Sequence, residues 1–558
     1  MMTYLTVPAS GAGRPTGAPS SRAGAPSGRP PTTNDTPGGG TPTSSARARG
    51  STKEMVHVPA TADSPHVPRT YGNWRRPTSP GLMGLGTAGT MILMAGLVLV
   101  VLVVMLTELL TGLVFAAGLA VVLLAIGVRD KHGLNALDKG AARWAWWRQR
   151  SAGEHLYRSG PLGQVPWGTC QLPGLAASSK LTEHSDSYGR RFALIRVPAT
   201  STYTLVIGTE PDGAALVDEE QVDSWVADWG LWLANLGDEP GIVAASVTIE
   251  TAPDTGTRLR REVATNVDPD APEFARALLA ETVAEYPHGS STVRAYVALT
   301  FNATYNGKRR RPAEFARELG ARLPGLTGEL QATGAGPAHP VDALELCELV
   351  RVAYDPAAAT AIDEAHAEGR TTGLTWADVG PSAAEASWDD YRHDSGASVT
   401  WAMTGAPRGN VQASILSRLI APHRDIARKR VTLLYRPIDA ASAAAIVEAD
   451  LRAAQFRQSS SDKPTARDVL ATRAAALTAQ EEAAGAGLVN FGMLVTATVL
   501  DEAREADARA AVENLAATAR LRLRPAFGSQ DTAFAAALPL GLVLPRHLDL
   551  PSQVRSRL

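Results

Sequence analysis

The sequence GLMGLGTAGTMILMAGLVLVVLVVMLTELLTGLVFAAGLAVVLLAIGV, residues 81–128, contains a single ionisable residue, Glu108. One helix needs about 20 apolar residues to cross the hydrocarbon core of a bilayer. The stretch is too long for one span and predicts a transmembrane α-hairpin over residues 84–128, with spans at about 84–106 and 110–128. Thr107, Glu108, Thr111 and Gly112 cluster between the two spans, so we expect the connecting turn there.

Charged residues on both sides of this hairpin predict its orientation. They are Arg69, Arg75, Arg76, Arg129, Lys131, Lys139, Arg143, Arg148 and Arg150. Because Lys and Arg accumulate on the cytoplasmic side of membrane spans, we expect both flanks and both termini in the cytoplasm of a multi-pass cytoplasmic-membrane protein. Glu108 then lies in the extracytoplasmic turn. An intramembrane acid can mark an ion path, but no partner acid or base is nearby, which favours a hydrated turn.

An aromatic and basic segment follows the hairpin. Within GLNALDKGAARWAWWRQR, residues 133–150, Leu134, Leu137, Ala141 and Trp144 fall at helical spacing. We expect a juxtamembrane amphipathic helix within residues 129–159. Its aromatic and basic side chains are Trp144, Trp146, Trp147, Arg143, Arg148 and Arg150. Trp favours the headgroup zone and Arg favours anionic lipid, so this collar predicts a membrane interface; stacking on single-stranded nucleic acid is the alternative.

A second membrane-proximal segment, residues 69–83, precedes the hairpin within RTYGNWRRPTSPGLMGLG, residues 69–86. Tyr71 and Trp74 suit the headgroup zone, and Arg75 and Arg76 suit its cytoplasmic side. The prolines at 77 and 80 keep a helix from extending upstream, so the first span is expected to start after them.

The residues before this segment have a different composition. Residues 1–68 are rich in Pro, Gly, Ser and Thr and are expected to be a disordered tail, because they can bury little apolar surface. They do not resemble a secretory signal, and whether they belong to the native start is left open. The first 150 residues carry a net charge of +9 and the remaining 408 carry −11. This balance favours anionic lipid over nucleic acid as the partner of the N-terminal third.

The remainder reads as alternating strands and amphipathic helices. Residues 160–311 predict a first cytoplasmic α+β domain of ferredoxin-like type, and residues 401–558 predict a second. The clearest helix, residues 218–237, carries a Trp and Leu stripe that is expected to be core. Residues 312–400 predict a mainly helical middle segment. The two α+β units show a weak likeness in the order of their elements without a sequence repeat.

Sequence motifs for chemistry are absent. The nearest approach to a phosphate-binding loop, NATYNGKRR at residues 302–310, has Asn302 and Arg309 where Gly and Ser or Thr are required. Acid and His cluster in WDDYRHDSGASVTW, residues 388–401, but sequence neighbours point in different directions, which favours a polar loop. Two basic clusters, residues 308–311 and 423–430, are expected to be solvated turns or a protein-docking patch. Cys170 and Cys347 cannot form a metal cage alone. We therefore predict no catalytic residue, cofactor or metal.

Three motifs resemble an actinobacterial family of integral membrane proteins associated with conjugative, type IV secretion-like systems. They are TYGNWRRPTSPGL at residues 70–82, VTIETAPDTG at 247–256 and GSQDTAFAAALPLGLVLP at 528–545. The arrangement also resembles a two-span subunit joined to the N-terminal region of a conjugation ATPase, in which a segment like FAAALPLG leads into the motor. Here the sequence ends at Leu558 without a motor.

This resemblance implies a structural subunit of a translocation complex that scaffolds a separate motor ATPase at the membrane. The implied partners are membrane lipid, that ATPase and other inner-membrane subunits, without sequence-specific nucleic-acid binding. Two spans line a pore only in an oligomer, and self-association stays open. The alternatives are a membrane subunit of type VII secretion, which shares the outline, and a membrane-anchored enzyme of unknown reaction.

Overall fold

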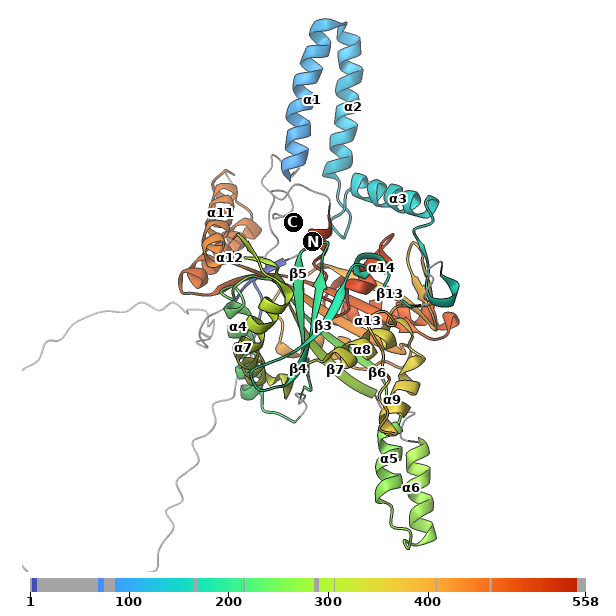
Figure 1. Ribbon diagram of the computed structural model, residues 1–558. Coiled ribbons are helices and arrows are strands. Elements are labelled where there is room, and N and C mark those ends of the chain that lie inside the picture. The colour runs from blue at the N-terminus through green and yellow to red at the C-terminus, as the bar shows by residue number, and fades with distance from the viewer. Residues whose placement is uncertain are drawn as a thin grey trace, which may run out of the picture. The chain divides into compact units, whose positions relative to one another are not determined.

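Figure 1 shows the computed structural model of the protein, which describes residues 3–7, 69–74, 86–163, 169–211, 213, 216–285, 291–305, 307–407, 409–460 and 464–548. The helices and strands discussed below belong to one compact unit, which comprises residues 1–11 and 70–558. This unit contains an apolar helical hairpin and one large antiparallel sheet with covering helices. The fold class is α+β, as predicted.

The hairpin consists of α1 (Gly86–Leu106) and α2 (Leu109–Gly127). Both helices are long and apolar enough to cross a membrane. Glycines let the two helices approach closely: a Cβ atom at Gly96 would lie 2.4 Å from the Leu119 side chain, and one at Gly112 would lie 2.1 Å from Val104. Thr107 and Glu108 lie between the two helices, where the break between the spans is expected.

The sheet consists of two halves that meet at its centre. Its strand order is β2-β11-β12-β13-β15-β14-β6-β7-β5-β4-β3, and all pairs are antiparallel. The first half contains β3 (Lys180–Ser185), β4 (Arg191–Val197), β5 (Thr202–Thr209), β6 (Ile242–Pro253), β7 (Ser291–Asn302) and β10 (Ala338–Pro340). The second half contains β11 (Ala383–Ala386), β12 (Tyr391–His393), β13 (Gly396–Gly405), β14 (Arg428–Ile438), β15 (Gly487–Val499) and β16 (Arg522–Pro525). At one edge, β2 (Leu156–Arg158) pairs with β11.

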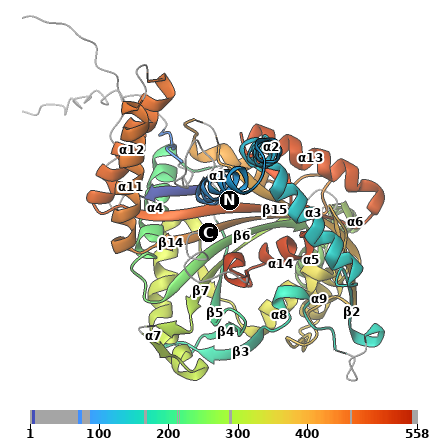
Figure 2. The ribbon, with the colours of Figure 1, turned by 90° about the horizontal axis from the view of Figure 1, so that it is seen from above.

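The two halves repeat one order of elements. The first runs β5, α4 (Glu219–Asn235), β6, α5 (Thr257–Asn266), α6 (Glu273–Glu285), β7, α7 (Pro312–Leu330) and β10. The second runs β13, α10 (Ser417–Ile420), β14, α11 (Ala440–Ser459), α12 (Ala466–Ala483), β15, α13 (Glu505–Thr518) and β16. In each half the fourth strand of the series pairs with the first, and the halves meet through their second strands, β6 and β14. Figure 2 shows these central strands side by side.

One face of the sheet is covered by helices from both halves. In β5, Tyr203, Leu205 and Ile207 point to this face, where they form a core with α4 and α7. Trp232 of α4 is buried, and its ring stacks on Trp229 with the centroids 4.7 Å apart. The predicted tryptophan stripe is therefore core. In the second half, α10 and α13 cover Trp401, Met403 and the apolar side chains of β14 and β15.

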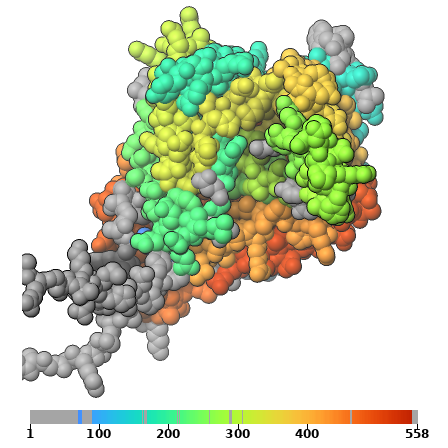
Figure 3. Space-filling model, turned by 90° about the horizontal axis from the view of Figure 1, so that it is seen from below, coloured from blue at the N-terminus to red at the C-terminus, as the bar shows by residue number. Residues whose placement is uncertain are grey.

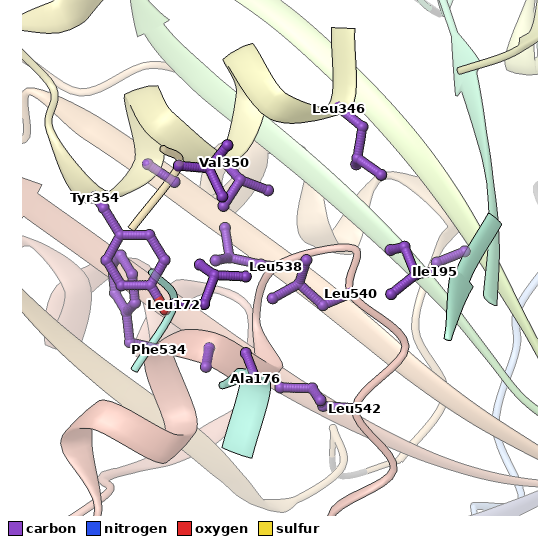
Figure 4. Close-up of a cluster of buried hydrophobic side chains, with 14 of the residues drawn as sticks. Leu172, Ala176, Ile195, Leu346, Val350, Tyr354, Phe534, Leu538, Leu540 and Leu542 are labelled. Carbon is purple, nitrogen blue, oxygen red and sulfur yellow. The ribbon is translucent and has the colours of Figure 1, made fainter. Parts of the chain in front are cut away.

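The other face is covered by α8 (Ala343–Tyr354), α14 (Gln530–Ala536) and the chain that follows α14. Figure 4 shows Leu538, Leu540 and Leu542 of this C-terminal segment beneath Leu346 and Val350 of α8. Cross-strand hydroxyl pairs lie on the sheet, including Thr248 with Thr432 and Thr204 with Thr300. The Thr432 hydroxyl donates to the carbonyl of Ala537 at 2.7 Å, so the segment is held by polar contacts as well as by apolar burial.

The tertiary structure differs from the predicted division into domains in several places. The units expected at 160–311 and 401–558 supply the two halves of one sheet. Residues 312–400 contribute α7, α8 and α9 (Ala358–Ala367), and also β10, β11, β12 and the start of β13. Within the expected tail, residues 3–7 form β1 (Thr3–Val7), which pairs with β15 at residues 487–491. Because β13 pairs only with residues 494–499 of β15, the backbone groups at 487–491 are open to such an extra strand.

The helical hairpin α5–α6 is inserted between β6 and β7, in the position that α11–α12 occupies between β14 and β15. Figure 3 shows α5–α6 on the surface of the body. The hydroxyl of Thr255, just before α5, donates to Asp363 of α9 at 2.8 Å. On α6, Phe274 is 80% exposed and Leu278 is 53% exposed, so this hairpin presents apolar side chains outward.

Candidate membrane-interface site

The predicted juxtamembrane helix is α3 (Ala136–Ser151), which is shorter than the expected 129–159 segment. Asn135 caps its first turn: the Asn135 side chain accepts from the amide of Asp138, and the Asp138 carboxylate accepts from the amide of Asn135. In the preceding turn, Asp130 accepts from the amides of His132 and Leu134 and pairs with Lys139 at 2.8 Å. The hydrogen bond from Lys139 is the main cause that lowers the pKa of Asp130.

One face of α3 is docked on the body through Trp146. Its ring lies 5.4 Å from that of Trp388, and Trp388 stacks on Phe527 at 5.7 Å. The guanidinium of Arg143 lies 5.5 Å from the Trp388 ring. Gly528 has a φ of 72°, and a Cβ atom there would come within 2.7 Å of Trp388, so this contact requires glycine. Trp146 thus contacts protein rather than facing outward.

The opposite face of α3 is exposed. Leu137, Trp144 and Trp147 are 49%, 60% and 62% exposed, and at 100° per residue they lie on the side of the helix away from Trp146 and Ala142. Arg148 lies 5.9 Å from the Trp144 ring. Of the three predicted interface tryptophans on α3, Trp144 and Trp147 have exposed side chains that can enter a headgroup layer. Their contact with lipid headgroups stays a prediction.

The segment before the hairpin also contacts the body. Tyr71 forms a β-bridge with Val411, and its hydroxyl donates to Asp223 at 3.0 Å. The side-chain amide of Asn73, whose φ is 63°, donates to the hydroxyl of Thr478 at 3.0 Å. The Trp74 ring meets Phe491 edge-on at 5.5 Å. Tyr71 and Trp74 therefore have protein partners, and their contact with headgroups stays a prediction; Arg75 and Arg76 lie outside the described residues.

Glu108 occupies the predicted turn. It is the N-cap residue of α2, with extended backbone angles, and its side chain makes no capping hydrogen bond. Glu108 and its neighbours in the turn are exposed. Glu108 thus lies between α1 and α2, and its place on the extracytoplasmic side of a membrane stays a prediction.

A groove runs between α3 and the edge of the body formed by α13 and β16. Its volume is about 920 Å³. Its charged lining consists of Asp130, Lys131, Lys139, Arg143, Glu513, Arg522 and Arg524. A guanidinium nitrogen of Arg522 donates to the carbonyl of Lys131 at 3.0 Å, and His132 lies 3.1 Å from the Thr404 hydroxyl. Sequence reasoning missed Arg522 and Arg524, although their alternation in RLRPAF, residues 522–527, is a signal that they share one side of a strand.

The acid and His cluster at 388–401 is a β-hairpin rather than an open polar loop. Asp394 and Ser395 form its turn, and His393 of β12 is 1% exposed. The His393 ring bonds the Tyr354 carbonyl at 2.6 Å and the Ser398 hydroxyl at 2.8 Å. Asp394 instead accepts from the amides of Ser382 and Ala383. No acid in this cluster orients His393, whose pKa burial lowers to about 4.

The second basic cluster, at 423–430, is largely internal, so its prediction as a solvated turn or docking patch is wrong for Arg428, Lys429 and Arg430. These residues belong to β14. Arg428 and Arg430 both bind Glu250 of β6, at 2.8 and 2.6 Å. Lys429 is 2% exposed and donates to the carbonyl of Ala421, and burial lowers its pKa to about 8. Tertiary pairing across the centre of the sheet therefore overrides the expectation that charge runs are solvated.

The first basic cluster, residues 308–311, is exposed only in part. Lys308 and Arg309 are exposed in β9 (Lys308–Arg309), whereas Arg310 pairs with Glu318 at 2.9 Å and lies over Phe315. Cys170 and Cys347 are both free thiols. Within the described ranges, no group of three or more His, Cys, Asp or Glu side chains is arranged to hold a metal ion.

One family profile matches the chain, over residues 78–138: a domain of unknown function (DUF8461). The matched region covers the hairpin and the first residues of α3, and it leaves the α+β body outside. No curated protein matches the sequence.

Proposed function

We propose that the protein is a membrane-anchored structural subunit of a bacterial conjugation or type IV secretion-like translocation complex, which holds a separate motor ATPase at the cytoplasmic membrane. The observation that carries this proposal is an apolar helical hairpin joined on both sides to a large α+β body. Tyr71, Asn73 and Trp74, which precede the hairpin, contact the body, and so does Trp146, which follows it. The resemblance of the three sequence motifs supplies the type of complex.

The proposed topology has two spans and both termini in the cytoplasm. It is supported by the basic residues on both flanks of the hairpin and by the exposed tryptophans of α3. The test is a pair of reporter fusions, one after Glu108 and one after Ser151. They should report opposite sides of the membrane, and reporters on the same side would contradict this topology.

We also propose that each half of the body is a ferredoxin-like unit. The support is the succession of strand, helix, two strands, helix and strand, with the fourth strand beside the first. Each unit has a helical hairpin inserted between its second and third strands. Two such units joined strand to strand form one continuous sheet, which suits a scaffold for other subunits.

A scaffold requires surfaces for other subunits, and the two inserted hairpins supply them. Phe274 and Leu278 are exposed on α6, and Phe456 and Leu470 are 71% and 65% exposed on α11 and α12. Apolar side chains grouped on solvent-facing helices are typical of protein contacts. The buried environment of His393 and Ser398 favours a structural over a catalytic interpretation of the most reactive-looking cluster.

The test is co-purification of the full-length protein in mild detergent with a motor ATPase encoded beside its gene. We expect binding by the wild type and loss of binding when Phe274 and Leu278, or Phe456 and Leu470, are changed to Asp. Tyr188→Asp is the matched control, because Tyr188 is 77% exposed in a turn outside both hairpins. Absence of binding, or robust ATP hydrolysis by the protein alone, would overturn the proposal.

A further inference from the structure

We propose that the groove between α3 and the α13–β16 edge binds the headgroup of an anionic phospholipid. This inference rests on the proposed membrane anchoring and adds a defined ligand site to it. The ligand chemistry is a phosphodiester with apolar chains attached.

The charge of the groove favours an anion. Five cationic side chains and two carboxylates line it, which leaves a net charge of +3, although the whole chain carries −2. Lys139 is committed to Asp130 at 2.8 Å. In the part of the chain that the structure describes, Arg143, Arg522 and Arg524 form no ion pair. Arg143 and Arg524 are therefore available for phosphate, which guanidinium groups bind through paired, charge-assisted hydrogen bonds, while one nitrogen of Arg522 already donates to the Lys131 carbonyl.

The remainder of the lining suits the glycerol backbone and the first carbons of acyl chains. Its apolar residues include Trp388, Trp401, Val512, Leu521, Leu523 and Phe527. The guanidinium of Arg524 lies 5.0 Å from the Phe527 ring, and that of Arg143 lies over Trp388. These aromatic contacts hold both cations at the groove without neutralising them. A volume of about 920 Å³ accommodates such a group.

A buried donor at the same site lacks an acceptor. Trp401 is 1% exposed and lines the groove. Its indole N–H has no hydrogen-bond partner among the described residues. This nitrogen is itself buried, so the headgroup is expected to contact the guanidinium groups of the groove rather than this N–H.

The groove is also placed where a membrane lipid can enter. One wall is α3, which begins nine residues after the end of α2. The other face of α3 carries the exposed Leu137, Trp144 and Trp147, which suit the headgroup layer. A headgroup seated in the groove would thus connect the membrane surface with α13 and β16 of the body.

The experiment measures thermal unfolding of the full-length protein in mild detergent, with added phosphatidylglycerol, phosphatidylcholine or inorganic phosphate. We expect phosphatidylglycerol alone to raise the unfolding temperature in a saturable manner. Changing Arg522 and Arg524 together to Gln should weaken the apparent affinity for phosphatidylglycerol at least about ten-fold, because each lost guanidinium removes charged hydrogen bonds. Arg452→Gln with Arg467→Gln, exposed cations of α11 and α12, should change it by less than about two-fold.

A second variant keeps the test valid if the double variant fails to fold. Arg143→Gln removes the one arginine that α3 contributes to the groove, and it should also weaken phosphatidylglycerol binding. Equal effects of phosphatidylglycerol and phosphatidylcholine would overturn the proposal. An equal effect of inorganic phosphate would assign the groove to free anions, and competition by a single-stranded oligonucleotide would assign it to nucleic acid; both outcomes contradict the lipid site.

Membrane fractionation separates the failure of this inference from the failure of the proposed anchoring. A protein that sediments with membranes but shows no lipid selectivity contradicts only the groove site. A protein that is recovered in the soluble fraction without detergent contradicts the anchoring itself.

Discussion

The ion cluster at the centre of the sheet allows a quantitative prediction. Glu250 of β6 accepts from Arg428 at 2.8 Å and from Arg430 at 3.0 and 2.6 Å. The Glu250 side chain is 16% exposed and that of Arg430 is 5% exposed. These contacts span the junction at which the two halves of the body meet. Glu250→Gln removes the anion and leaves two largely buried guanidinium groups without a counter-charge.

The magnitude follows from the pKa of Glu250. Burial alone would raise this pKa, but Arg430 and Arg428 outweigh burial and lower it from 4.5 to about 2. A difference of this size corresponds to about 3 kcal/mol of stability. Breaking a buried ion pair by removing one partner typically costs about 3–5 kcal/mol, so the two routes agree. We expect Glu250→Gln to lower the free energy of unfolding by about 3 kcal/mol at neutral pH.

The pH dependence has a definite sign. The folded pKa lies below the unfolded one, so this stabilisation is fully present above pH 4.5 and is lost as the pH falls from 4.5 towards 2. Urea unfolding of the full-length protein in mild detergent, followed by tryptophan fluorescence at several pH values, measures both effects. The variant should lose this part of the acid dependence.

The matched control is Glu448→Gln on α11. Glu448 and its partner Arg452 are 75% and 72% exposed at a separation of 3.5 Å, so this change should cost about 0.5 kcal/mol or less. A cost below about 1 kcal/mol for Glu250→Gln, or an unchanged acid limb, would refute the reasoning that this cluster holds the two halves together.

Three further predictions test other parts of the structure. Burial lowers the pKa of His393 to about 4, so between pH 6.5 and 4 the unfolded chain binds a proton that the folded chain does not, and stability should fall as the pH drops through this range. In urea titrations, His393→Gln should reduce this fall in the free energy of unfolding. An unchanged pH dependence in the variant would show that another group is responsible. Gly541→Ala places a Cβ atom 2.1 Å from the Thr204 hydroxyl at a residue whose φ is 67°, and it should destabilise the protein by more than about 2 kcal/mol. Gly140→Ala in α3 has open space around the new Cβ atom and should stabilise the protein by up to about 1 kcal/mol. Similar shifts of the urea midpoint in both variants would contradict the close packing around Gly541. Trp146→Ala should lower the free energy of unfolding by about 2 kcal/mol, and Trp144→Ala should lower it by less than about 0.5 kcal/mol. Urea unfolding followed by far-UV circular dichroism measures both values. The reverse ranking would show that α3 docks through its other face.

Local patterns in the sequence determined most of the elements. The uncharged stretch at 81–128 predicts two apolar helices because hydropathy and length are properties of the segment itself. The alternation of strands and helices after the hairpin, and the helix expected at 218–237, which is α4, follow from the two-residue and 3.6-residue periods, because these periods are local signals. Short elements such as β11, β12 and β16 were not predicted, since a few residues carry little periodicity.

Only the tertiary structure decided what these elements contact. The join between β6 and β14 merges the two expected units into one sheet, and it makes internal ion partners of the run Arg428 to Arg430, which the sequence alone places on the surface. Neighbouring tryptophans on α3 likewise separate, with Trp146 on the body and Trp147 exposed, because a helix turns each residue by 100°. Arg143 and Arg524 are far apart in the chain and line one groove. Periodicity specifies which face of an element is apolar, but the identity of the surface that covers that face depends on contacts between distant residues, which no local pattern records.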